Sequence, residues 1–136
     1  DLAADTEFDV SVASSDAAAN TVTTSATSTH TVDTSADASA DAAVAITLTT
    51  INNAAKGTVE YTVSGLDTDA TGVVTFTDAS SNTVTANVSA NSTAEVNLTA
   101  LTDGTITASL AVTDTAGNTA TGATDTATLD TVATAG

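Results

Sequence analysis

Apolar and polar residues alternate with a period of two along most of this chain, which predicts β-strands rather than helices. Seven such stretches follow residue 43, each with its apolar residues on one face. Their inward-phased positions are Val44, Ile46 and Leu48; Val59, Tyr61 and Val63; Val74 and Phe76; Val84, Ala86 and Val88; Ala94, Val96 and Leu98; Ile106, Ala108, Leu110 and Val112; and alternate positions of a threonine-rich stretch, 119–129. A strand with one apolar face needs a second sheet to cover that face.

Clusters of Gly, Asn, Asp and Ser separate the seven stretches and predict turns. Short strands at this spacing predict an all-β fold, an immunoglobulin-like β-sandwich of about 100 residues. Gly122 and Ala123 break the alternation in the last stretch, which indicates a β-bulge there.

Before this region, residues 7–14 alternate clearly and 20–32 more weakly, with a predicted turn at 16–20 between them. Two strands are marginal alone in water, so residues 1–32 need strands from a preceding repeat or from another chain. The segment 33–43 carries an Asp every four residues among Ala and Ser. Like charges at that spacing disfavour a helix, so we expect an extended linker.

An internal repeat sets the expected domain boundaries. A shift of 98 residues aligns Phe8, Val10, Val12, Asp16 and Asn20 with Ile106, Ala108, Leu110, Asp114 and Asn118. After a slip of one residue, the sequence Val-Asp-Thr at 32–34 aligns with Leu-Asp-Thr at 129–131. We therefore expect residues 1–32 to be the C-terminal strands of one repeat and 33–130 to be a complete repeat. Residues 131–136 then begin the next repeat or a linker, so the expected architecture is a tandem repeat.

The net charge is −16 at pH 7, and Lys56 is the single basic residue. This charge disfavours binding to nucleic acid or to an anionic membrane surface, and it makes a cation the expected counterpart. Of the 17 acidic residues 14 are Asp, which suits turns and oxygen-ligand sites. The absence of Cys excludes disulfides and thiolate metal sites. No leader and no apolar stretch of membrane-spanning length is evident, so a mature internal segment without membrane insertion is the simplest interpretation.

Six aspartates form a candidate metal site. In an immunoglobulin-like sandwich the chain enters at one end, and the loops after the second and sixth strands return to that end. The entering linker and these two loops carry the candidate ligands Asp33, Asp37, Asp41, Asp67, Asp69 and Asp114. Converging carboxylates repel each other, and Ca²⁺ readily takes several such oxygens, so the expected cofactor is Ca²⁺. The alternatives are turn residues without an ion and the general surface acidity of a halophile.

Several motifs carry a resemblance to a known family. They are Gly65-Leu-Asp-Thr-Asp-Ala70, Val73-Val-Thr-Phe-Thr-Asp78, Leu101-Thr-Asp-Gly-Thr-Ile106, Val112-Thr-Asp-Thr-Ala-Gly-Asn118 and Leu129-Asp-Thr131. In this order they resemble the bacterial immunoglobulin-like repeats of giant secreted adhesins and biofilm surface proteins, and the resemblance covers essentially the whole chain. It implies extracellular extender domains, often stiffened by calcium, in proteins exported by the type I route. No proline follows Thr131, where such repeats often have one.

The expected function is that of a structural extender repeat of an extracellular, cell-surface adhesin. Its expected partners are neighbouring repeats of the same chain or filament, with homotypic or surface contacts besides. Catalysis is not expected, because His30 is the single histidine and no serine motif such as G-x-S-x-G lies near it. One alternative is a self-assembling subunit of a filament or surface layer, in which residues 1–32 pair with another molecule. The other is a carbohydrate-binding module, although Tyr61 is inward-phased and so unsuited to a sugar platform.

Overall fold

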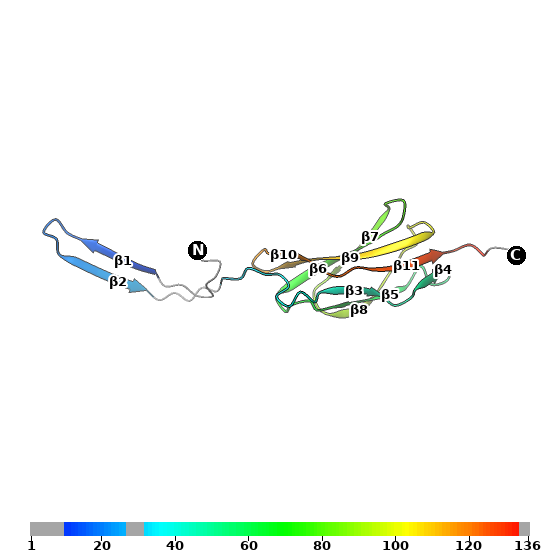
Figure 1. Ribbon diagram of the computed structural model, residues 1–136, viewed down its shortest axis with the longest axis horizontal. Helices are drawn as coiled ribbons and strands as arrows, with labels where there is room; N and C mark the ends of the chain where they lie inside the picture. The colour runs from blue at the N-terminus through cyan, green and yellow to red at the C-terminus, as the bar shows by residue number, and fades with distance from the viewer. Residues whose placement is uncertain (1–9, 27–31, 134–136) are drawn as a thin grey trace. The chain divides into compact units, whose positions relative to one another are not determined.

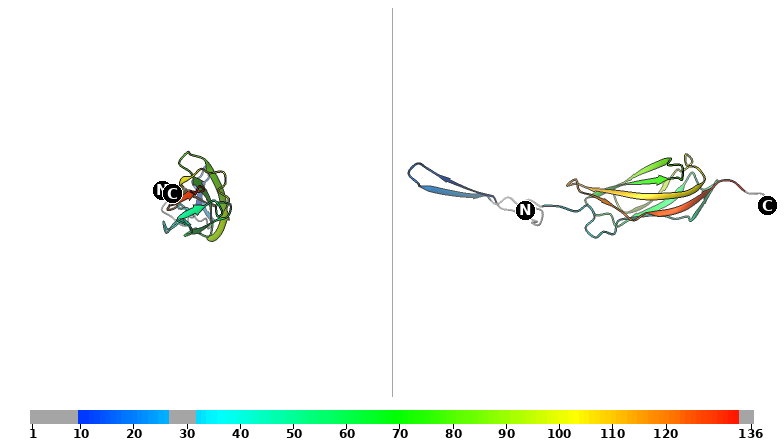
Figure 2. Two further views of the ribbon diagram at one scale, coloured as in Figure 1. Left: turned by 90° about the vertical axis from the view of Figure 1, so that its right-hand side faces the viewer. Right: turned by 45° about the horizontal axis from the view of Figure 1, so that its top comes forward.

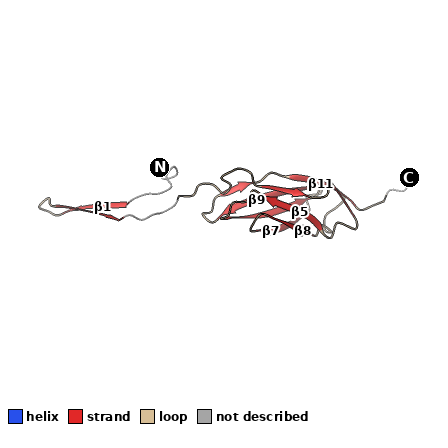
Figure 3. Ribbon diagram, turned by 90° about the horizontal axis from the view of Figure 1, so that it is seen from below, coloured by secondary structure: helices blue, strands red, loops and turns tan. Residues whose placement is uncertain are grey.

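The computed structural model describes residues 10–26 and 32–133. The chain divides into two compact units, an N-terminal unit, Asp1–Thr34, and a C-terminal unit, Ser35–Gly136. All regular secondary structure in the described ranges is β-strand (Figures 1 and 3). The strands are β1 Val10–Ser15, β2 Thr21–Ala26, β3 Ala43–Ile46, β4 Thr50–Asn52, β5 Val59–Ser64, β6 Ala70–Thr77, β7 Thr83–Val88, β8 Ser92–Val96, β9 Gly104–Asp114, β10 Thr119–Thr121 and β11 Asp125–Asp130.

The described part of the N-terminal unit is an antiparallel hairpin, in which β1 pairs with β2 from Val10↔Ala26 to Ser15↔Thr21. Every residue of β1 is exposed. The turn between the strands is the predicted one, with Ala19 in a left-handed conformation (φ 63°).

Two sheets form the C-terminal unit and pack face to face (Figure 2). The smaller sheet has the order β3-β5-β8, and the larger has the order β4-β11-β9-β6-β7, with β10 added beside β9. Neighbouring strands are antiparallel except for β11 and β4, which are parallel. This is the topology of an immunoglobulin-like β-sandwich, as the sequence predicts.

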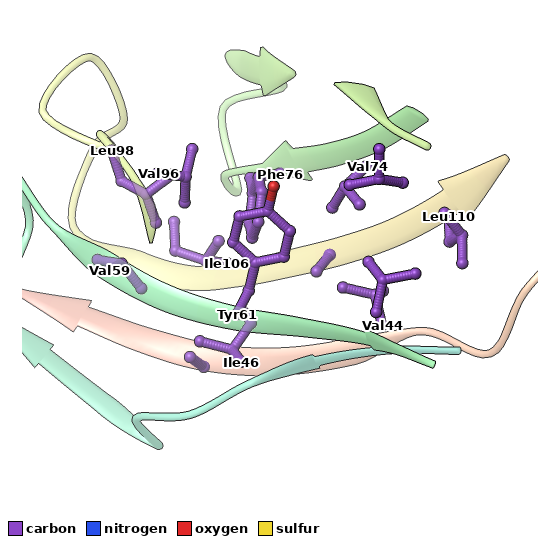
Figure 4. Close-up of a cluster of buried hydrophobic side chains, with 14 of the residues drawn as sticks. Val44, Ile46, Val59, Tyr61, Val74, Phe76, Val96, Leu98, Ile106 and Leu110 are labelled. Atoms are coloured by element: carbon purple, nitrogen blue, oxygen red, sulfur yellow. The ribbon is translucent and has the colours of Figure 1, made fainter. Parts of the chain in front are cut away.

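The core lies between the sheets and is almost entirely aliphatic (Figure 4). Inward positions of β5, β6 and β9 are buried in strict alternation, because successive side chains of a strand point to opposite faces. Tyr61 from the smaller sheet meets Phe76 from the larger sheet edge to face, with ring centroids 5.3 Å apart. Both rings are buried, which confirms the interpretation of Tyr61 as a core residue.

The first and last strands of the C-terminal unit run side by side and parallel. The Val44 amide donates to the Ala123 carbonyl (3.1 Å), and the Ile46 amide donates to the Asp125 carboxylate (2.8 Å). Farther along, β4 pairs with β11. The first strand therefore begins in the smaller sheet and continues in the larger one, which closes one side of the sandwich.

This crossing corrects one prediction. Leu48 is predicted to face inward but is 39% exposed, because residues 47–49 cross between the sheets and the alternation restarts at the fully buried Ile51. The predicted last strand, 119–129, is likewise divided into β10 and β11. Its break lies at Gly122, where an added Cβ would come within 2.8 Å of the Ala42 carbonyl oxygen.

The segment 35–42 differs from the expected linker. It contains no helix, but a turn closes where the Ala40 amide donates to the Asp37 carbonyl (3.2 Å), and Ala40 has φ 53°. Ala36 and Ala42 are buried in the sandwich core. The segment is therefore part of the folded unit and not an extended spacer.

Candidate metal site

The candidate site lies at the end of the sandwich where segment 35–42 joins it, which we call the entering pole. The loop between β5 and β6, residues 65–69, and the loop between β9 and β10, residues 115–118, meet at this pole. The Thr115 amide donates to the Asp69 carbonyl (3.1 Å), which joins the two loops. The Ala38 amide donates to the Asp67 carboxylate (2.9 Å), which joins the entering segment to the first loop. The predicted convergence of these three segments is therefore observed.

Two residues fix the position of the β5–β6 loop. Gly65 has φ 71°, and an added Cβ there would collide with the backbone of Asp41 and lie 2.7 Å from the Ala42 nitrogen. Glycine is thus needed both for the left-handed conformation and for the close approach. On the other side of the loop, the Asn91 carboxamide accepts from the Leu66 amide (2.7 Å) and donates to its carbonyl (3.2 Å).

Together with Asp114, the β9–β10 loop forms a five-residue turn, which its first and last side chains hold. The backbone amide of Asn118 donates to one Asp114 carboxylate oxygen (2.8 Å), and its side-chain amide donates to the other (2.7 Å). Gly117 supplies the left-handed residue of the turn (φ 91°). Burial opposes the charge on Asp114, but hydrogen bonds from Asn118, Gly117 and Ala116 outweigh that effect and hold its pKa below the usual range. Asp114 is therefore a buried carboxylate that stays ionised.

Asp69 and Asp114 are the two predicted ligands that come together within the C-terminal unit. Each offers a carboxylate oxygen, and these oxygens lie within 4.8 Å of one another. Asp114, the first residue of its turn, is buried, whereas Asp69 is exposed. The pairing of Ala70 with Asp114 across β6 and β9 sets this proximity, because it aligns the ends of two neighbouring strands. One buried and one accessible carboxylate make an arrangement suited to a hard cation.

The other predicted ligands have different surroundings. The Asp37 carboxylate accepts from the backbone amides of Asp41 (3.2 Å) and Ala42 (3.1 Å), so it caps the turn in its own segment. Asp67 holds Ala38, as described above, and Asp41 is exposed. Asp33 belongs to the N-terminal unit, and its assignment as a ligand stays a prediction from the sequence.

Asp78 lies in the same kind of turn, with a threonine as a further partner of its carboxylate. The turns Asp16–Asn20, Asp78–Asn82 and Asp114–Asn118 share one pattern, in which both carboxylate oxygens of the Asp accept from the Asn. Asp78 is buried and also accepts from the amide (2.8 Å) and hydroxyl (2.7 Å) of Thr102. Hydrogen bonds from Asn82 and Thr102 hold its pKa far below the usual range. This role was not predicted, although the recurring spacing Asp-x-x-x-Asn is a sequence signal for it.

A second missed carboxylate lies at the opposite end of the sandwich, which we call the exit pole. The Asp103 carboxylate accepts from the amide (3.1 Å) and hydroxyl (2.8 Å) of Thr131, just after β11 ends. These two hydrogen bonds, with the charge of Lys56, hold the Asp103 pKa below its usual range. The motifs Leu101–Ile106 and Leu129–Thr131 contain the two partners, but nothing in their spacing pairs them.

His30 lies outside the described residues. Within the described ranges, the single group of acidic or histidine side chains close enough to share a metal ion is the one that includes Asp69 and Asp114. No helix in those ranges is long and apolar enough to span a membrane.

The comparisons with known proteins are sparse. No protein-family model matches the chain, and no curated protein does. Among solved structures, the chain is similar to a tetra-tandem repeat in the extending region of a large adhesion protein, with 24% sequence identity and a TM-score of 0.49. The similarity covers 90% of this chain and 32% of that one.

Proposed function

We propose that the C-terminal unit is a non-enzymatic extender repeat of a long extracellular bacterial adhesin, a spacer in a series of similar units at the cell surface. The observation that carries this proposal is the path of the chain through the sandwich. The chain enters the sandwich at the entering pole and leaves it at the exit pole (Figure 1). At each pole a carboxylate holds the passing backbone, Asp67 for the entering segment and Asp103 for the exit segment.

Opposite poles matter because units joined head to tail then add their lengths. Strand β9 has 11 residues and spans about 35 Å at about 3.3 Å per residue, so each repeat advances a series by about 40 Å. The two tethers restrict the backbone where a flexible joint would otherwise form. A spacer of this kind needs reach and stiffness, and its partners are the neighbouring repeats.

We further propose that Ca²⁺ binds between Asp69 and Asp114 and stiffens the entering pole, with Asp33, Asp37, Asp41 and Asp67 as the other predicted acidic ligands. Comparison with Asp78 supports this. Thr102 donates two hydrogen bonds to Asp78, whereas Asp114 has the carboxylate of Asp69 within 4.8 Å. Two like charges at that distance repel, and a divalent ion would offset both.

Thermal melts with calcium and with chelator, at matched ionic strength, test the ion. Extracellular modules bind Ca²⁺ with dissociation constants of about 10⁻⁴–10⁻³ M, so 10 mM calcium should raise the melting temperature by roughly 6–22 °C. Titration calorimetry should show saturable binding. Replacing Asp69→Asn and Asp114→Asn should remove both effects. A charge-matched control, Glu95→Gln with Asp130→Asn, changes two exposed acids away from the pole and should keep them. Identical melts with calcium and chelator would leave the aspartates as turn residues only.

Small-angle scattering of two and four joined copies of residues 33–130 tests the spacer. The maximum dimension should grow by about 40 Å for each added copy. A folded-back, compact assembly would contradict the proposal. Self-association of the chain into filaments would favour the subunit alternative, and specific retention by a glycan array would favour the carbohydrate-binding alternative.

A further inference from the structure

The β1–β2 hairpin has the same register as the β9–β10 hairpin of the C-terminal unit. Ser15 pairs with Thr21, and Thr113 pairs with Thr119. Each residue of the first pair lies 98 positions before its counterpart in the second pair. The next pairs, Ser14↔Val22 and Ala13↔Thr23, match Val112↔Ala120 and Ala111↔Thr121. Both hairpins close with an Asp-x-x-x-Asn turn of the same hydrogen-bond pattern. The two hairpins are therefore equivalent in backbone as well as in sequence.

Their environments differ sharply. Val10, Val12 and Val22 lie on one face of the β1–β2 hairpin and are 49%, 63% and 63% exposed. Their counterparts are Ala108 and Leu110, both 0% exposed, and Ala120, which packs against the core. The opposite face of β1 carries Ser11, Ala13 and Ser15. The hairpin thus presents an apolar face that its twin buries, on a chain of strongly acidic character.

We propose that this face, Val10, Val12 and Val22, is a docking surface for the remaining strands of a second immunoglobulin-like sandwich, which precede the hairpin in the same polypeptide. In that sandwich β1 would take the place of β9 and pair with a strand equivalent to β6. The facing sheet would supply strands equivalent to β3, β5 and β8 and cover the three valines.

The C-terminal unit of a second copy is a poorer occupant, for a steric reason. Its own β9 and β10 already fill the position that the hairpin would take, with Ile106, Ala108 and Leu110 fully buried. Docking there would require those strands to leave, which exposes as much apolar surface as it covers. A sandwich that lacks its own strands equivalent to β9 and β10 has no such competitor.

Thr24 adds a detail to the proposed sandwich. It stands where Gly122 stands in the C-terminal unit, and a Cβ at Gly122 would lie 2.8 Å from the carbonyl oxygen of Ala42 and 2.9 Å from Leu110. The first strand of the second sandwich therefore cannot approach its last strand as closely at this point.

A fusion chain tests this inference without knowledge of the upstream sequence. A second copy of residues 35–98 is fused directly before Asp1 of the intact chain 1–136. Residues 1–34 then follow this copy in the same way as residues 99–131 follow residues 35–98 in the C-terminal unit. Hydrogen exchange of the 10–26 peptide is then measured by mass spectrometry, with the C-terminal unit as internal reference. An isolated hairpin exchanges fast, so docking should slow exchange on the order of 100-fold or more relative to the unfused chain.

Variants of the fusion separate docking from general compaction. Val12→Asp should abolish the protection, whereas Ala13→Asp, on the opposite face of the same strand, should keep it. Residues 35–98 normally pack against the β9–β10 hairpin. A further variant of the fusion, Val10→Ala with Val12→Leu and Val22→Ala, therefore gives the β1–β2 hairpin the side chains that β9 and β10 carry at these positions. Protection in either fusion that is sensitive to position 12 supports the proposal, and fast exchange in both overturns it.

Sedimentation of the unfused chain distinguishes a second copy. A concentration-dependent dimer that Val12→Asp dissociates would overturn the proposal in favour of self-association. A monomer at all concentrations is the expected result. Neither result depends on calcium, so this inference and the proposed calcium site fail or stand separately.

Discussion

Gly65→Ala should destabilise the C-terminal unit far more than Gly117→Ala, although both glycines have positive φ. Placing Ala in a left-handed conformation costs about 1–2 kcal/mol at either position. At Gly117 nothing lies within 4 Å of the added Cβ, so this conformational cost is the whole expected effect. At Gly65 the new methyl would collide with the backbone of Asp41 and Ala42, which cannot rotate away as a side chain can.

The extra cost at Gly65 follows from what must move. Overpacking of this kind costs about 1–3 kcal/mol. Relief requires the entering segment to shift outward, which strains the hydrogen bond from Ala38 to Asp67 and exposes the buried Ala42. The total for Gly65→Ala is therefore about 2–5 kcal/mol. With about 4–8 °C for each kcal/mol in a unit of about 100 residues, it should melt roughly 5–20 °C below Gly117→Ala.

Thermal unfolding followed by circular dichroism measures this difference, with calcium and with chelator. Limited proteolysis supplies a local readout, since a displaced segment 35–42 should be cut sooner in Gly65→Ala than in Gly117→Ala. Equal melting temperatures for the two variants would refute the reasoning. They would mean that segment 35–42 can shift outward without a loss of stability and that the β5–β6 loop does not hold it in place.

Three further outcomes are expected. Leu110→Ala should cost about 3–5 kcal/mol in urea unfolding, because it leaves a cavity in the core, whereas Val73→Ala on the exposed face of β6 should cost less than about 1 kcal/mol. The folded-state pKa of Asp78 is depressed, so its contribution is present above its ordinary pKa of 3.8 and lost as pH falls below that value. Melting temperatures should therefore fall below about pH 4, with a shallower fall in Asp78→Asn, and parallel pH profiles would count against this role. Asp103→Ala should speed exchange of the Thr131 amide while leaving that of β6 unchanged, and an unaltered Thr131 rate would show that the exit tether is not needed.

The strands were predictable because their periodicity reflects a local rule, the alternation of side chains across a pleated sheet. Leu48 was misassigned because the crossing between sheets depends on a partner far along the chain. Alternation in 44–48 continues across the point where Ile46 bonds to Asp125, 79 residues away. Periodicity within a stretch contains no information about such a partner.

The entering pole was predictable at the level of loops but not of atoms. Topology alone places Asp67, Asp69 and Asp114 at one end of the sandwich. The different roles of Asp67, which accepts a backbone hydrogen bond, and Asp69, which lies beside Asp114, depend on the register between β6 and β9 and on the turn at Gly65. Asp103 was missed for a related reason, since its partner Thr131 is remote in sequence. For Asp78 only the contact with Thr102 is remote, because the spacing to Asn82 is local and could have been recognised.

The parallel pairing of β4 with β11 has a mechanical consequence. Tension applied through the chain draws β4 toward the entering pole and β11 toward the exit pole, so the two strands are pulled past each other along their length. The pairs Thr50↔Thr128, Ile51↔Leu129 and Asn52↔Asp130 are then loaded together and not one after another. Under such shear the sandwich must break these contacts in one event before any strand can extend, and its lifetime under load is set by the unfolding rate rather than by its equilibrium stability.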